Sequence, residues 1–189
     1  MSLSREPLAV QLVVAIRSNR LSNVKRLLAQ GANVNSRHNT NRQTALAWAT
    51  SSKPNIVKYL INKGATVNAR DDKGRTPLMS AVLQGREDIV RMLLDAHANI
   101  NARDKNGVTP LMWAVFRRRT SIVRLLLSRG ARLNARSNNG RHAMNFINTP
   151  MVPGGWVEPM KNKNKNEMTR ALIPSLRSLS AREVTGRFR

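Results

Sequence analysis

The sequence has no cysteine and few aromatic or acidic residues. Its 189 residues include 4% Phe, Trp and Tyr, and only 10 Asp and Glu against 33 Lys and Arg. Without thiols, a disulfide framework, a thiolate metal site and a cysteine nucleophile are excluded. No apolar run reaches about 18 residues, so we expect no transmembrane helix.

Positive charge is the most unusual property of the chain. The formal net charge is +23 and the sequence pI is about 12.0. Residues 1–136 carry 24 Lys and Arg and 7 Asp and Glu, whereas residues 137–189 carry 9 and 3. The surplus therefore lies mainly outside the C-terminal tail. Such a field favours acidic partners, namely nucleic acid, an anionic membrane or an acidic protein.

The sequence repeats with a period of 33 residues. Several independent columns share this spacing, and it indicates an array of units that bury their faces only against their neighbours. The columns are Asn35, Asn68, Asn101 and Asn134; Leu28, Ile61, Leu94 and Leu127; Val34, Val67, Ile100 and Leu133; and Gly31, Gly64 and Gly130, with His97 in the third copy.

Each unit is predicted to contain two helices and a turn. In the third copy Thr76 is a candidate N-cap and Pro77 the first helical residue, and Thr109-Pro110 repeats this pair. The first helix should break at Gln84-Gly85. A second apolar stripe, from Ile89 to Leu94, then predicts the second helix.

The pattern resembles the ankyrin repeat. The match lies in Thr76-Pro77-Leu78-Met79-Ser80-Ala81, in the equivalent block 109–114, and in the glycine-to-asparagine loops that follow each second helix. This resemblance implies an all-α solenoid of about four repeats plus a degenerate fifth. We place the repeat domain at 1–148, with units 7–37, 38–70, 71–103, 104–136 and a partial 137–148, and an extended basic tail at 149–189.

Some copies depart from the family pattern. The second copy has one extra residue near Asn39 to Asn41 and one fewer near Lys53-Pro54, which affects its packing against its neighbours. Ala or Met replaces the family's usual histidine at three positions, so we expect the hydrogen bonds of that histidine to be absent. His97 should cost about 1 kcal/mol relative to glycine in a left-handed position. The three positions are Ala47, Met79 and Met112.

The resemblance also implies where a partner would bind. Proteins of this family usually meet partners at the hairpin tips and on the concave surface of the inner helices. Two basic ladders add charge at a spacing of 33 residues, one at the hairpins and one on the outer helices (Lys25, Lys58, Arg91 and Arg124). The candidate partner-binding residues are Arg37, Arg70, Lys73, Arg75, Leu83, Gln84, Arg103, Lys105, Phe116, Arg117, Arg136 and Arg141.

Two functions from different classes fit these residues. The first is a non-enzymatic adaptor that holds an acidic protein segment. The second is a structural RNA-binding subunit of a ribonucleoprotein particle, which would use the basic array and tail on phosphates. Its additional candidate contacts are Arg118, Arg119, Lys161, Lys163 and Lys165. Trp48 and Trp113 are interpreted mainly as packing between repeats, with base stacking as the alternative.

Catalysis finds no support in the sequence. His38, His97 and His142 fall in separate loops without ligand spacing or acidic partners, and no phosphate-binding loop or paired carboxylate is present. We therefore predict no catalytic residue, no metal, no cofactor and no small-molecule substrate. We expect an intracellular protein that is monomeric on its own, with the compartment left open.

Overall fold

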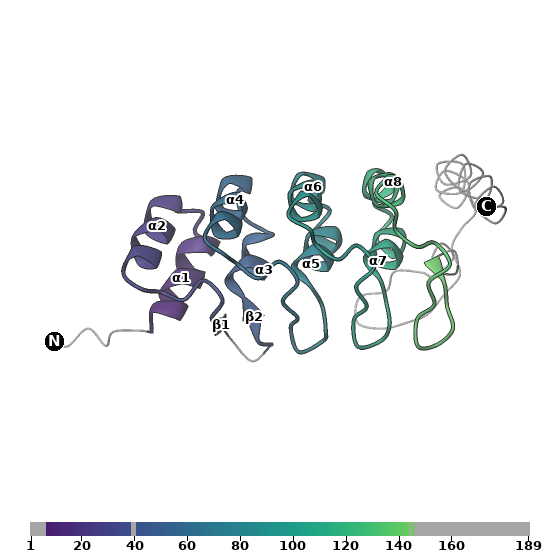
Figure 1. Cartoon of the computed structure of the whole chain (residues 1–189), viewed down its shortest axis with the longest axis horizontal. Helices are drawn as coiled ribbons and strands as arrows, with labels where there is room; N and C mark the ends of the chain where they lie inside the picture. The colour runs from purple at the N-terminus through teal and green to yellow at the C-terminus, as the bar shows by residue number, and fades with distance from the viewer. Residues whose placement is uncertain (1–6, 39–40, 144, 146–189) are drawn as a thin grey trace, which may run out of the picture.

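Helix pairs stack side by side along the chain, as Figure 1 shows for the computed structural model. The structure describes residues 7–38, 41–143 and 145, and this part contains four helix pairs. In each pair the inner helix lies next to the hairpins and the outer helix lies beyond it. The predicted all-α solenoid is thus confirmed. The inner helices are α1 (Leu8–Arg17), α3 (Ala45–Ala49), α5 (Pro77–Gln84) and α7 (Pro110–Phe116), and the outer helices are α2 (Leu21–Ala29), α4 (Pro54–Asn62), α6 (Glu87–Asp95) and α8 (Thr120–Ser128).

Threonine and proline start the inner helices as the sequence predicts. The Thr76 hydroxyl accepts a hydrogen bond from the Met79 amide at 3.4 Å, and the Thr109 hydroxyl accepts one from the Met112 amide at 3.3 Å. At α7 the Met112 sulfur also accepts the Thr109 amide at 3.4 Å. A thioether is a weak acceptor, so α7 keeps one bond at this position although Met112 replaces the family's usual histidine.

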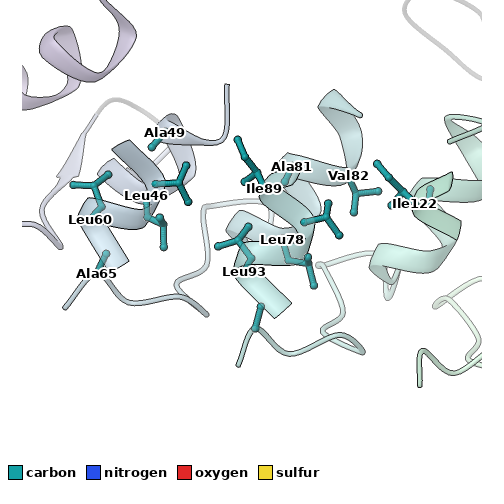
Figure 2. Close-up of a cluster of buried hydrophobic side chains, with 14 of the residues drawn as sticks. Leu46, Ala49, Leu60, Ala65, Leu78, Ala81, Val82, Ile89, Leu93 and Ile122 are labelled. Carbon is teal, nitrogen blue, oxygen red and sulfur yellow. The ribbon is translucent and has the colours of Figure 1, made fainter. Parts of the chain in front are cut away.

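The core runs between the repeats without interruption. Figure 2 shows Leu46, Leu78 and Ile89 among the apolar side chains that connect one helix pair to the next. All three are fully buried. Removing a buried leucine side chain typically costs about 2–5 kcal/mol. Stability therefore depends on contacts between neighbouring copies as much as on contacts within one copy.

The second copy accommodates its shifted residues by shortening its inner helix. Helix α3 has five residues, and side chains close the turn after it. The Thr50 hydroxyl donates to the Ala47 carbonyl at 2.8 Å, and the Ser52 hydroxyl donates to the Ile16 carbonyl of the first copy at 2.9 Å. Helix α3 still packs against both α1 and α5, so the stack is continuous through this copy.

Adjacent hairpins are joined through their backbones. Strands β1 (Arg37–His38) and β2 (Gln43–Thr44) form an antiparallel pair with Arg37 opposite Thr44. Beyond them the Lys105 amide donates to the Lys73 carbonyl at 3.0 Å, and equivalent bonds join the hairpins on either side. At the Gly74 position a Cβ would lie 2.9 Å from the Lys105 amide nitrogen, because the hairpins approach closely.

In the described part of the chain, four residues other than glycine have a left-handed backbone. They are Asn19, Arg42, His97 and Arg118, with φ between 51° and 62°. The left-handed conformation predicted for His97 is confirmed by its φ of 62°. Arginine is less suited to this conformation than asparagine or histidine, so Arg42 and Arg118 carry the larger strain.

Replacing His97 by glycine should stabilise the protein. We expect His97→Gly to raise the free energy of unfolding by about 0.5–1 kcal/mol, since glycine adopts this backbone without a Cβ penalty. Gly130→His should have the opposite effect of similar size, because a Cβ at Gly130 meets no atom within 4 Å. Urea unfolding measures both. A loss of stability in His97→Gly would show that the imidazole makes a stabilising contact.

The close approach of the hairpins can be tested with a pair of alanine variants. Gly74→Ala and Gly64→Ala both place a Cβ on a left-handed backbone, with φ of 74° and 81°. Only Gly74→Ala also pushes against backbone of the next copy, so it should lose about 1–2 kcal/mol more in thermal or urea unfolding. Equal losses of unfolding free energy in the two variants would mean that the hairpins can move apart without cost.

Candidate interaction surface

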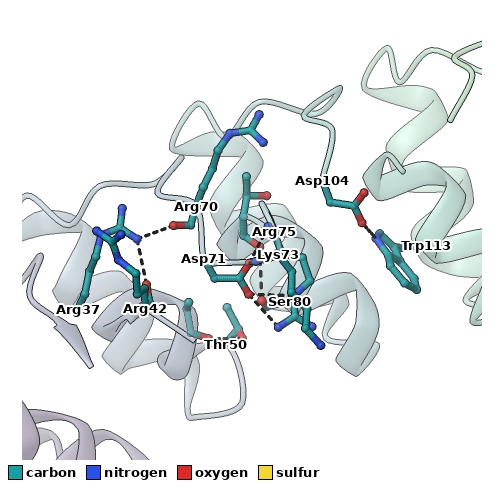
Figure 3. A network of polar contacts seen from close by, with 12 residues as sticks. Arg37, Arg42, Thr50, Arg70, Asp71, Lys73, Arg75, Ser80, Asp104 and Trp113 are labelled. Carbon is teal, nitrogen blue, oxygen red and sulfur yellow. Dashed lines mark hydrogen bonds and ion pairs between the residues drawn. The ribbon is translucent and has the colours of Figure 1, made fainter. Parts of the chain in front are cut away.

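The arginines of the hairpin ladder bind backbone carbonyls. This ladder consists of Arg37, Arg70, Arg103 and Arg136. Arg37 donates to the Arg42 carbonyl of its own hairpin at 3.0 Å and to the Arg70 carbonyl of the next copy (Figure 3). Arg70 repeats the pattern on Gly74, at 3.1 Å, and on Arg103. The guanidinium groups therefore hold neighbouring hairpins together while their charge stays exposed.

The last two members of the ladder bond different groups. Arg103 donates to the Asn138 side-chain oxygen at 3.2 Å, and Arg136 donates to the Gly140 carbonyl of its own hairpin at 2.9 Å. Each bond contributes on the order of 1 kcal/mol, so alanine at a ladder position would alter stability as well as binding. Sequence reasoning predicted these arginines as partner contacts and missed their structural role.

The recurrent asparagines also join one copy to the next. The Asn68 side chain donates to the His97 carbonyl at 3.2 Å and accepts from the Asn99 amide at 2.7 Å. Asn35 makes the same two bonds, to the Gly64 carbonyl and from the Thr66 amide. These bonds hold the left-handed residue after each outer helix in place, and they run between repeats rather than within one hairpin.

Asp71 and Asp104 are engaged by residues of their own repeats. Asp71 accepts hydrogen bonds from the Lys73 and Arg75 amides and pairs with the Arg75 guanidinium at 2.8 Å. The Asp71 side chain is only 3% exposed. Asp104 accepts two hairpin amides and the Trp113 indole N–H at 3.1 Å (Figure 3). Arg75, predicted as a partner contact, is thus half-buried in an ion pair.

Two predicted lysines lie at the tips with free side chains. Lys73 and Lys105 are exposed, and in the described part of the chain neither ammonium group has a hydrogen-bond or ion-pair partner. Arg141 is also exposed and lies in the last described hairpin. The ammonium groups of Lys73 and Lys105 therefore present charge to solvent.

The inner helices supply a second part of the predicted surface. Leu83 and Phe116 are half-buried at corresponding positions of α5 and α7. Phe116 packs edge-to-face on Trp113 with ring centroids 5.8 Å apart, while Gln84 donates to the Thr50 hydroxyl at 3.0 Å. Arg117 is exposed at the end of α7. The structure therefore brings an apolar pair and a cation together in the fourth copy.

The tryptophans pack mainly against the body of the stack. Trp48 and Trp113 are half-buried against the core. The Arg17 guanidinium lies 5.5 Å from the Trp48 ring centre, a cation–π distance. Trp48 thus contacts the preceding copy, whereas Trp113 contacts Asp104 and Phe116 of its own copy.

A third basic ladder lies at the turns between inner and outer helices. Arg20, Lys53, Arg86 and Arg119 are 33 residues apart and are the N-cap residues of the four outer helices. The Arg86 guanidinium donates to the Ser52 carbonyl of the preceding copy at 2.9 Å. A Cβ at Gly85 would lie only 2.7 Å from the Arg119 guanidinium carbon. The 33-residue spacing of these four cations is visible in the sequence, but the sequence analysis identified only the other two ladders.

The acids nearest to this ladder are on α6 and are already paired. Hydrogen bonding from Arg91, and then from Ser121, lowers the pKa of Glu87. The bond from Arg86 lowers the pKa of Asp88, and the two side chains pair at 3.0 Å. Both carboxylates are therefore charged at neutral pH and engaged by residues of the chain itself.

The outer helices carry the remaining predicted ladder. Lys25 lies 5.6 Å from the Tyr59 ring centre, and Arg91 pairs with Glu87 at 2.6 Å. Lys58 and Arg124 are exposed, and no side-chain partner is found for them among residues 7–38, 41–143 and 145. This surface is less positive than the hairpins and turns.

Some predictions concern residues outside the described part of the chain. These are the basic tail at 149–189 and the candidate phosphate contacts Lys161, Lys163 and Lys165. Among the described residues, no three His, Asp or Glu side chains come together as a metal ion would require. No helix within those same residues has both the length and the apolar character needed to cross a bilayer.

Comparison with known proteins identifies the repeat. A family model described as ankyrin repeats in three copies matches residues 12–104, and a model described as ankyrin repeat matches residues 106–138. No curated protein matches the chain significantly. Ankyrin repeats generally act as protein–protein interaction modules rather than enzymes. The matched residues cover the helix pairs and hairpins described above, and the chain belongs to the ankyrin-repeat family.

Proposed function

We propose that this protein is an adaptor that binds an acidic segment of a partner protein. The observation that carries the proposal is uncompensated charge on a rigid stack. The described residues hold 24 Lys and Arg against 6 Asp and Glu. Each of the six carboxylates is engaged by a residue of the chain itself, in five ion pairs and in the bonds to Asp104. Binding of external carboxylates would relieve the remaining repulsion between cations.

Residues with free side chains are the best candidates for direct contact. Lys73 and Lys105 lie on adjacent hairpins whose backbones are bonded to each other, so their spacing is fixed by the fold. The ladder arginines add to the positive electrostatic potential rather than making specific contacts, because their N–H groups already donate to backbone carbonyls. A partner segment lying across these two hairpins would meet one free cation on each.

RNA binding is the second candidate. The surplus of 24 against 6 charges favours it, since phosphate neutralisation needs only clustered Lys and Arg. Against it, Trp113 already has its indole N–H on Asp104 and its ring packed with Phe116. This packing and the half-burial of both rings reduce the ring surface open to a base, so an RNA ligand would be held mainly through phosphates.

Charge reversal at the hairpin tips tests the proposal. Lys73→Glu with Lys105→Glu should weaken binding of a glutamate-rich peptide by about tenfold or more, because two attractions become repulsions. The control Lys58→Glu with Arg124→Glu makes the same change in net charge on the outer helices. Isothermal titration calorimetry measures the dissociation constants.

Salt dependence separates the two candidates. Phosphate binding predicts that log affinity falls linearly with log salt concentration, with a slope of about −0.7 to −0.9 for each contact. A protein segment should give a shallower slope. The adaptor proposal fails if an oligouridylate binds more tightly than the acidic peptide and shows the steep slope.

A further inference from the structure

The first helix pair has a pocket between its two helices. It lies at the end of the stack formed by α1 and α2 (Figure 1), has a volume of about 230 Å³, and we call it the first-repeat pocket. Pockets for small-molecule ligands typically measure roughly 300–1,000 Å³, so this one is better suited to a single side chain of a larger partner. Its lining includes Val14, Ala15, Arg20, Asn23, Arg26 and Leu27.

Asn23 shows which side of the repeat the pocket occupies. The equivalent residues of the other three copies are Ile56, Ile89 and Ile122, and each is at most 1% exposed. Ile89 and Ile122 lie on the side of their helix pairs that faces the preceding copy (Figure 2). Among the described residues no helix pair precedes α1 and α2. Asn23 therefore stands in place of an isoleucine on an end face that no described repeat covers.

Part of the pocket is apolar. Ala15 and Leu27 are 5% and 2% exposed, whereas Val14 is 54% exposed, and no other large apolar side chain of the described residues is exposed. A single exposed valine is ordinary by itself. Here it lines a concave surface together with two buried apolar residues, so an aliphatic side chain that enters the pocket would be removed from water.

Cations line the same pocket. Arg20 is exposed, and its guanidinium has no hydrogen-bond or ion-pair partner in the described part of the chain. The Arg26 guanidinium donates to the Gln30 side-chain oxygen at 3.2 Å, which engages one of its five N–H donors. The pocket thus places guanidinium donors next to an apolar surface.

The first two copies contain no described carboxylate that could neutralise these arginines. Residues 7–38 and 41–70 hold ten Lys and Arg and no Asp or Glu. All six described acids lie between residues 71 and 104. The two that come first in the sequence are already paired, Asp71 with Arg75 and Asp72 with Arg42. The charge that complements this end of the stack must therefore come from another molecule.

We infer that the first-repeat pocket binds an aliphatic side chain of an acidic partner segment, and that carboxylates beside this side chain pair with Arg20 and Arg26. Arginine suits the task because it can hold a carboxylate through two parallel hydrogen bonds. The inference rests on the proposed function. It adds a second contact, because Lys73 and Lys105 belong to the third and fourth copies.

An acidic segment fits this pocket better than a second copy of the chain or RNA. A second copy would bring 24 Lys and Arg against 6 Asp and Glu in its described residues, so it would add repulsion between cations. RNA bases bind single-strand sites by stacking on aromatic rings. None of the described residues that line the pocket is aromatic.

A pair of short peptides tests the apolar contact on the full chain. The probe is a fluorescent peptide of six residues, five Asp or Glu with one Leu at the third position, and its control has Ser in place of Leu at the same net charge. In fluorescence anisotropy titrations the Ser peptide should bind about three- to tenfold more weakly, because it buries less apolar surface. Equal affinities of the two peptides would overturn the inference.

Variants of Val14 show whether this preference arises in the pocket. Val14→Ser should remove the difference between the two peptides, whereas Val14→Leu should keep it, since only the first loses the apolar side chain. Because Val14 is exposed, both variants should unfold within about 2 °C of the wild-type midpoint. An undiminished preference for the Leu peptide in Val14→Ser would place the aliphatic side chain elsewhere and overturn the inference.

Charge reversal tests the arginines. Arg20→Glu should weaken binding of the Leu peptide by about tenfold or more. The matched control Lys58→Glu makes the same charge change at an exposed position of α4 and should weaken binding less than threefold. Equal losses in the two variants would overturn the pocket as a site, because net charge alone would then act.

The remaining outcomes separate this inference from the proposed function. A peptide centred on the pocket reaches about 10 Å to either side, while two layers of helices at about 8–10 Å each separate the first copy from the third. Loss of binding only in Lys73→Glu with Lys105→Glu would therefore overturn the pocket and leave the adaptor function in place. Binding of the longer glutamate-rich peptide without binding of the six-residue peptide would do the same. A chain that binds neither peptide would contradict both proposals.

Two further measurements assign the pocket to a different occupant if the inference is wrong. Tighter binding of an oligouridylate of six nucleotides, with the same dependence on Arg20, would assign the site to RNA. Self-association in analytical ultracentrifugation that is lost in Val14→Ser would assign it to a second copy of the chain. The inference expects neither result.

Discussion

Contact between neighbouring repeats is the interaction on which the rest of this structure depends. One helix pair cannot enclose its own apolar side chains, so residues such as Leu78 and Ile89 are buried only because adjacent copies cover them. The same stacking fixes the spacing of every residue that recurs with the period. A charge or hydrogen-bonding group at one repeat position therefore becomes a row along the molecule.

Polar rows hold this stack together at three levels. Asparagines join the loops after the outer helices, arginines join the hairpins, and Arg86 joins two turns. Because each bond connects a side chain to backbone of a neighbouring copy, it is insensitive to the identity of the neighbouring residue. This explains how the second copy keeps its place despite a five-residue inner helix.

The fold was predictable from the sequence because its determinants are local and repeated. Thr76 and Pro77 mark a helix start wherever they fall, and the 33-residue period marks the stack. The candidate surface was only partly predictable. Sequence alone identifies Arg70 and Arg75 as cations, but it does not say that Arg70 bonds two carbonyls or that Arg75 is paired with Asp71. Those assignments depend on side-chain directions that only the assembled stack provides.

Positions that break the repeat pattern carry more functional information than positions that follow it. An arginine in a regular ladder is explained by the stack, as the carbonyl bonds of Arg37 and Arg70 show. Arg118 is different, because it replaces a glycine that the third copy uses, and its left-handed backbone works against stability. The third copy closes the same turn with glycine, so the stack alone does not require a side chain at this position.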